Sequence, residues 1–247
     1  GLSPTTVRHL HARIHTALEQ ALRRGLVFRN VASLVMAPAR AYTEMRSLTP
    51  QEAKKVLKAA RGDRLEALYV LALTSGMRRG ELFALSWSNV DLENGTLKVA
   101  GALLADGTIV PPKTLKSRRH VALTQLAIEA LQRRRIIQLE ERLAASTEWD
   151  NEFDLVFANM VGNPLNPSNF SARDFPALLR RSGVKRIRFH DLRHSTASLL
   201  LSLDVHPKIV QELLGHSTIG VTMDIYSHSM PSLQEEAVTR LDTLLAP

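Results

Sequence analysis

The feature that most constrains the fold is a run of ten mainly apolar residues, 65–74, followed closely by Gly76-Met77-Arg78-Arg79-Gly80. Apolar residues on all sides of a helix predict that the helix is buried in a core. Two glycines within five residues then interrupt it. The sequence therefore predicts a turn that holds two arginines against the core, in a place that charged groups normally avoid.

The composition indicates a globular protein that binds a polyanion. Hydrophobic residues make up 45% and charged residues 23% of the 247 residues, which excludes intrinsic disorder and collagen-like repeats. The formal net charge is +8 and the sequence pI is about 10.2, values typical of proteins that contact nucleic acids.

The sequence contains neither cysteine nor a membrane signal. Without cysteine there can be no disulfide, thiolate nucleophile or cysteine-ligated metal. The apolar run is shorter than the roughly 20 residues that a membrane-spanning helix needs, and the N-terminus has no signal-peptide pattern. We expect a soluble, cytoplasmic protein with no membrane partner.

The chain is expected to contain parts of two domains, residues 1–44 and residues 45–247. Ser3 and Pro4 begin an amphipathic helix that Gly25 ends. Because this helix cannot enclose a core alone, we expect residues 1–44 to be the C-terminal part of a helical domain that starts upstream, with a linker. The second domain begins with a capping-box pattern, Thr49-Pro50-Gln51-Glu52.

The second domain is expected to be α+β, mainly helical, with a small three-stranded antiparallel sheet. Asn94-Gly95 and Asp106-Gly107 are the strongest hairpin signals in the chain. The strands are expected within residues 97–103, 108–111 and 119–123, which alternate in part between apolar and polar.

Helices are expected over most of the remaining chain. A long helix follows Thr124 as its N-cap, with Arg133-Arg134-Arg135 on its polar side. Further helices follow, separated by Gly183, Gly215 and Pro231.

His190 and Arg193 form a second candidate site. On a helix, a spacing of three places the imidazole and the guanidinium on one face, where both can bind one phosphate. His190 and His194 also imitate the spacing of a zinc helix, but Asp191 stands where the zinc proteases of that type have glutamate.

The other candidate residues also have ordinary structural interpretations. Arg78 can be a solvated helix terminus that pairs with Glu81, and the basic run 113–119 can be a solvated hairpin. His216 can be a helix C-terminal residue, and Tyr226 can be a half-buried aromatic residue. Taken singly, none of these residues defines a function.

Four segments together resemble the signature boxes of the tyrosine recombinases, in particular the phage-type and transposon-type integrases. They are TSGMRRGEL at 74–82, HDLRH at 190–194, LLGHS at 213–217 and DIYSH at 224–228. The resemblance covers residue 47 to the C-terminus. Residues 2–30 are similar to the closing helix of the family's core-binding domain, and the fold expected for the second domain is the family's catalytic fold.

The resemblance implies a set of catalytic residues. They are Arg78, Lys113, His190, Arg193, His216 and Tyr226. The lysine is expected on a hairpin, where Lys113 matches the family best and Lys116 is the alternative. Two positions depart from the family's pattern, since Ser75 stands where threonine is frequent and Asp204 where glycine is common.

The implied reaction is site-specific DNA recombination by transesterification. The Tyr226 hydroxyl attacks a DNA phosphodiester to give a 3′-phosphotyrosine and a free 5′-hydroxyl, and a 5′-hydroxyl of another strand reverses the step. His190 would assist proton removal from the phenol, and Lys113 would protonate the leaving alkoxide. No metal, cofactor or ATP is implied, because one ester replaces another and arginines neutralise the transition state.

The implied partner is double-stranded DNA that carries recombination sites. DNA contacts are expected from Lys116, Arg118 and Arg119, with Arg133, Arg134, Lys185, Arg186 and Arg188 as further candidates for backbone contact. We expect a homotetramer on DNA and a monomer free in solution. An amphipathic C-terminal segment, residues 231–245, is expected to pack either on its own domain or on a neighbouring protomer.

Two other functions remain as alternatives. Residues 204–217 imitate a helix-turn-helix, which would suit a non-catalytic DNA-binding regulator but would leave the arginines, histidines and Tyr226 unexplained as a set. A type IB topoisomerase would share the tyrosine chemistry and would release supercoils as a monomer.

Overall fold

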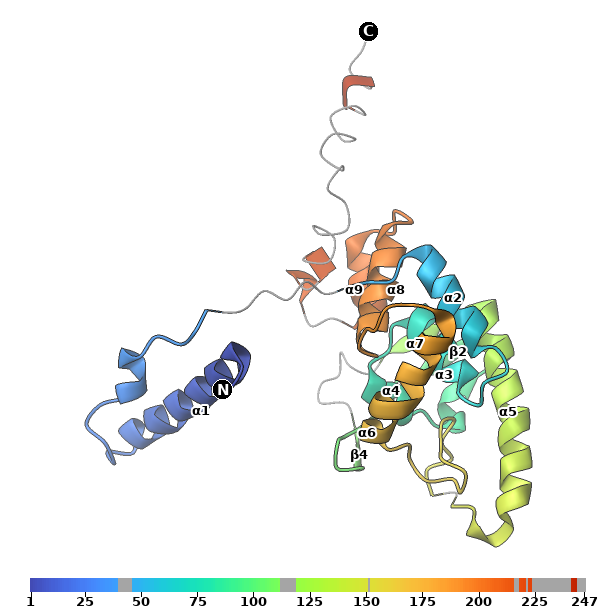
Figure 1. Ribbon diagram of the computed structural model, residues 1–247, viewed down its shortest axis with the longest axis horizontal. Helices are drawn as coiled ribbons and strands as arrows, with labels where there is room; N and C mark the ends of the chain where they lie inside the picture. Colours follow the sequence, from blue (N-terminus) through green and yellow to red (C-terminus); the bar gives the residue numbers. More distant parts are fainter. Residues whose placement is uncertain are drawn as a thin grey trace. The chain divides into compact units, whose positions relative to one another are not determined.

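The computed structural model describes residues 1–39, 46–111, 119–150, 152–215, 218–220, 222–223 and 241–243 (Figure 1). Its contacts divide the chain into two compact units, Gly1–Met45 and Arg46–Pro247, which are described separately. No helix within the described ranges is long and apolar enough to cross a bilayer.

The first unit consists of helix α1 (Pro4–Arg23) and the 3-10 turn η1 (Val31–Leu34). The predicted N-cap of α1 is confirmed, because the Ser3 side chain accepts a hydrogen bond from the backbone N–H of Thr6. His11 Nε2 lies 3.0 Å from the carbonyl oxygen of Ala32 and 2.9 Å from that of Val35, so it joins α1 to η1. No residue of α1 is buried against the described part of the unit.

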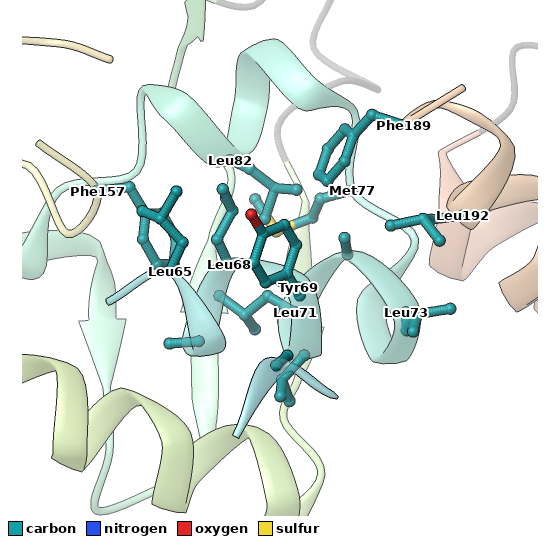
Figure 2. Packing of buried hydrophobic residues seen from close by; sticks show 14 of the residues in the cluster. Leu65, Leu68, Tyr69, Leu71, Leu73, Met77, Leu82, Phe157, Phe189 and Leu192 are labelled. Carbon is teal, nitrogen blue, oxygen red and sulfur yellow. The ribbon is translucent and has the colours of Figure 1, made fainter. Parts of the chain in front are cut away.

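The second unit begins with α2 (Pro50–Ala60), and its predicted capping box is confirmed. Thr49 Oγ1 accepts from the backbone N–H of Glu52, and Glu52 Oε2 accepts from that of Thr49. The predicted buried helix is α3 (Glu66–Ser75), whose residues are buried almost throughout. Figure 2 shows Leu68, Tyr69 and Leu71 of α3 among the side chains of the core.

The aromatic core fixes the segment that carries His190. Phe189 packs edge-on against Phe170 and Phe175, with ring centroids 4.9 and 5.2 Å apart. Leu192 is buried in the same cluster (Figure 2). The residues on both sides of His190 are therefore anchored, and they fix the position of its backbone at the start of α8.

A three-stranded antiparallel sheet is present, but its strands differ from the prediction. β2 (Thr96–Lys98) lies between β1 (Val90–Asp91) and β5 (His120–Ala122). The segment around residue 110, predicted as a strand of this sheet, pairs instead with β3 (Ala102–Leu103) as β4 (Ile109–Val110). Asn94-Gly95 therefore connects β1 to β2, and Asp106-Gly107 connects β3 to β4. The chain leaves the three-stranded sheet after β2 and returns to it at β5.

The described part of the second unit also contains further helices and short helical turns. They are α4 (Arg79–Phe83), η2 (Trp87–Asn89), α5 (Gln125–Ala145), η4 (Ser146–Glu148), α6 (Pro167–Asn169), the π-helical turn η5 (Phe170–Asp174), α7 (Phe175–Ser182), α8 (Asp191–Leu201) and α9 (Pro207–Leu214). The central helix α3 contacts α5 and α8, and α2 contacts α7 (Figure 1). Thr124, Gly183 and Gly215 cap helices as predicted.

Arg134 of α5 is buried, so the prediction that it contacts a DNA backbone is wrong. Its side chain is 1% exposed, and its guanidinium donates to Glu141 and to the carbonyl of Val156. Glu141 also accepts from Arg64, which is partly exposed, so one buried carboxylate is shared by two guanidiniums. The polarity of arginine suggested an exposed position, but a buried arginine is tolerated where a carboxylate and further acceptors compensate its charge. Here Glu141, seven residues further along the same helix, supplies the carboxylate.

Candidate active site

The turn between α3 and α4 is where the segments of the candidate site meet. Gly76 has φ 59°, and a Cβ atom there would lie 2.2 Å from Leu214 Cδ2 and 3.4 Å from Thr196 Cβ. A side chain at this position would therefore displace the Leu214 side chain, and the left-handed backbone would strain any residue other than glycine. Thr196 Oγ1 also donates to the carbonyl of Leu73, which ties α8 to α3 directly.

Arg78 is held from two sides. Its backbone N–H and its Nη1 each donate to the Glu81 carboxylate at 2.9 Å, and its Nη2 donates to the carbonyl of Gly215 at 2.9 Å. The Arg78 side chain is 41% exposed, whereas that of Glu81 is 6% exposed. Arg78 is therefore both oriented and open to solvent, as a side chain that binds an external anion must be.

Arg193 is buried and forms no ion pair with a carboxylate of the described residues. It is 3% exposed, its Nη1 donates to the carbonyl of Gly76 at 2.6 Å, and its Nη2 has no hydrogen-bond partner among the described residues. Burial, and after it the charge of Arg78, lowers the pKa of Arg193 to about 9, so the group is still charged at neutral pH. An uncompensated buried cation of this kind favours a bound anion.

His190 stands directly before α8, at the positive end of the helix. Its ring lies edge-on to His194, with centroids 5.3 Å apart. Desolvation, followed by the charges of His194, Arg193 and Arg78, lowers the pKa of His190 below its ordinary 6.5. Neutral imidazole is thus the main form at pH 7, and only the neutral form can accept a proton.

The N-terminus of α8 is fixed by Asp191. Its carboxylate accepts from the backbone N–H of Arg188 at 2.7 Å and from the Arg188 side chain. Arg188 remains 71% exposed, which is compatible with the predicted contact to a DNA backbone.

Several predicted site residues lie outside the described residues. They are Lys113, Lys116, Arg118, His216 and Tyr226. The structure therefore brings together three of the six predicted catalytic residues, Arg78, His190 and Arg193, and leaves the placement of the other three untested. Of the described residues, no group of three or more His, Asp or Glu side chains is arranged to hold a metal ion.

Glu81 is a site residue that sequence reasoning treated only as a surface partner of Arg78. It accepts from two arginines, since Arg119 donates to both of its carboxylate oxygens at 3.2 and 2.9 Å. The spacing of three residues between Arg78 and Glu81 predicts the contact of Glu81 with Arg78, but the sequence gives no signal for its contact with Arg119. The expected DNA contact of Arg119 has no support here, because its side chain is 8% exposed and donates to protein groups.

Comparison with known proteins identifies the family of the chain. The model of the phage integrase family matches residues 46–232. A "Tyrosine recombinase XerC-like" protein of Caldanaerobacter subterraneus is 32% identical over 99% of this chain and 67% of its own length. The ICEBs1 integrase of Bacillus subtilis is 28% identical over 99% of this chain and 67% of its own length. The chain spans about two thirds of the length of these relatives.

Solved structures show the same fold. A Tn1549 transposon integrase in complex with a circular intermediate DNA superposes with a TM-score of 0.80 at 21% identity, over 98% of this chain and 80% of that one. A lambda integrase dimer bound to a core site gives a TM-score of 0.66 at 20% identity, over 90% of this chain and 59% of that one.

The fold is that of the tyrosine recombinase catalytic domain, and the predicted fold class is confirmed. The chain belongs to the phage integrase family, the tyrosine recombinases that cleave and rejoin DNA, as the four motifs predicted.

Proposed function

We propose that this chain is the catalytic part of a site-specific recombinase that forms a 3′-phosphotyrosine link to double-stranded DNA through Tyr226. The observation that carries the proposal is the buried Arg193 guanidinium beside the half-exposed Arg78, with Glu81 as the carboxylate shared by Arg78 and Arg119. Together the three guanidiniums carry two positive charges in excess of that carboxylate. A phosphodiester that gains charge during attack is the ligand that such a site favours.

Each catalytic residue has a separate role in the proposed reaction. Arg78 and Arg193 bind the nonbridging oxygens of the scissile phosphate, and His216 donates a further hydrogen bond to it. His190 accepts the phenol proton as Tyr226 attacks phosphorus, and the 5′-oxygen leaves with a proton from Lys113. The reverse step, with a 5′-hydroxyl of another strand, restores the phenol and completes strand exchange.

The test is a nicked DNA substrate. A library of duplexes with a random central segment, nicked at varied positions, is incubated with the chain in excess chelator, and products are separated under denaturing conditions. We expect covalent protein–DNA product without a divalent metal, because guanidiniums supply the charge. Cleavage that requires magnesium, or DNA binding without any covalent product, would contradict the proposal.

The assembly on DNA is part of the proposal. The Tn1549 integrase and the lambda integrase were solved with DNA, the latter as a dimer, which supports double-stranded recombination sites as this chain's partner. We propose a homotetramer on two such sites, because exchange of both strands between two duplexes cleaves four phosphates and each cleaved phosphate requires one protomer.

A pH profile tests the role of His190. Under subsaturating DNA, the second-order rate of covalent linkage reports groups of the free enzyme. Because the pKa of His190 is lowered from 6.5, we expect this rate to hold as the pH falls from neutrality and to drop only below 6.5. His190→Asn should lower the rate and remove this acidic limb, whereas a wild-type midpoint above 6.5 would exclude His190 as the base.

A further inference from the structure

Arg119 lies at the point where three parts of the active site meet. It precedes β5, and its carbonyl accepts from the backbone N–H of Val99 at the end of β2. Its Nη1 and Nη2 donate to the two oxygens of Glu81, and its Nε donates to the carbonyl of Leu213 at 3.2 Å. One guanidinium thus connects the sheet to α4 and to the C-terminal end of α9.

Arg78 also joins Glu81 to the end of α9. It donates to Glu81 and to the carbonyl of Gly215, two residues beyond the carbonyl that Arg119 binds. Arg119 also packs directly on Gly215, where a Cβ atom would lie 3.1 Å from its Nη1 and 3.2 Å from its Cδ. The end of α9 is therefore held by both arginines, and His216 follows it in the chain.

The charges of this cluster explain why two arginines share one carboxylate. Burial alone raises the pKa of Glu81, but the hydrogen bonds and charge of Arg119, and then the hydrogen bonds of Arg78, lower it below its ordinary value. Glu81 is thus ionised, and one guanidinium is enough to neutralise it. With Arg119 bound to both oxygens, Glu81 can orient Arg78 while the cluster keeps one net positive charge.

We infer that Arg119 is a positioning residue for the proposed transesterification. Its guanidinium holds Glu81 beside the end of α9, and Glu81 in turn orients Arg78 toward the scissile phosphate. The cluster keeps a net positive charge. The inference rests on the proposed function, and it replaces the expected DNA contact of this residue. A fork of three directed donors is needed, so lysine, which is a single point charge, cannot take its place.

The experiment separates DNA binding from chemistry in Arg119→Met. We expect a dissociation constant within about twofold of the control and an unchanged salt slope, because no phosphate contact is lost. The rate of covalent linkage at saturating DNA should fall about 10²-fold, the size of effect seen when one transition-state donor is lost. Arg119→Lys should recover less than about a tenth of the lost rate.

The matched control is Arg181→Met. It removes one arginine and one ion pair, that with Asp63, from an exposed position where the arginine is 50% exposed. This variant should bind DNA and form covalent product as the wild type does. Thermal unfolding of each variant shows whether it is folded at the assay temperature, and Arg119→Lys provides the test should Arg119→Met not fold.

A substrate with a neutral methylphosphonate at the scissile position gives a readout that a general loss of structure would not change. Such a group needs less positive charge in the transition state, so the defect of Arg119→Met should shrink several-fold with this substrate. Loss of affinity with a smaller salt slope and an unchanged rate at saturation would overturn the inference and restore a phosphate contact. No covalent product from the wild type would instead contradict the proposed function.

Discussion

Tyr226→Phe is expected to abolish the covalent protein–DNA product while leaving DNA binding within about twofold of the wild type. The substitution removes only the nucleophilic oxygen, and phenylalanine cannot form the phosphoester. The arginine cluster that binds phosphate stays complete, so affinity and its salt dependence are retained. The measurement compares denaturing gels of nicked substrates with binding under native conditions.

The chain contains three tyrosines, which supplies the controls for this experiment. Tyr69 is 1% exposed in the core, and burial raises its pKa well above 10, so its hydroxyl is neither accessible nor ionised. Tyr69→Phe should keep covalent activity, as should Tyr42→Phe. A covalent product that survives in Tyr226→Phe, with the linked peptide mapped to another residue, would rule out Tyr226 as the nucleophile.

Local sequence signals predicted the helices well because each acts within a few residues. Ser3, Thr49 and Thr124 cap the helices that they were expected to cap, and Gly215 ends α9 with φ 68°. Asp204, which stands where glycine is common, has φ 58°, the left-handed conformation that glycine adopts without strain. These features need no knowledge of the distant chain.

Strand pairing and buried charge were predicted less well, because both depend on contacts that form only in the folded chain. Residues 108–111 have a strand pattern, but the pattern does not say which strand they join. Arg134 and Arg119 look like solvated basic residues, yet their carboxylate partners, Glu141 and Glu81, hold both of them inside the domain. A single sequence shows the charge of an arginine and not the place of its partner.

The chemical groups of the active site were predictable where their signals are local. His190 and Arg193 are three residues apart, which places both on one face of a helix, and the glycines around Arg78 predict a tight turn. These three residues could therefore be identified from the sequence. The carbonyls that orient the two arginines, Gly76 for Arg193 and Gly215 for Arg78, are over 100 residues away along the chain. Sequence therefore identified the chemical groups, and the fold supplies their positions.

Arg193→Met is expected to lower the rate of covalent linkage at saturating DNA by at least about 10³-fold, because a charged donor does more for a phosphoryl transition state than a neutral one. Arg193→Lys should recover little, since the Nη1 bond to Gly76 and a free Nη2 require the planar guanidinium. Stability should change little, because the lost hydrogen bond is offset by relief from burying an uncompensated charge. Single-turnover rates and thermal unfolding measure the two effects.

Arg134→Met is the matched control, because Arg134 is also a buried arginine but has a carboxylate partner. Its removal leaves Glu141 with Arg64 alone and should cost stability on the order of 3 kcal/mol. Below its unfolding temperature, this variant should form covalent product at the wild-type rate. The two substitutions should therefore have opposite effects: Arg193→Met lowers the rate of covalent linkage, whereas Arg134→Met lowers the free energy of unfolding. An Arg193→Met variant that unfolds easily but stays active when folded would show that Arg193 serves the fold rather than the phosphate.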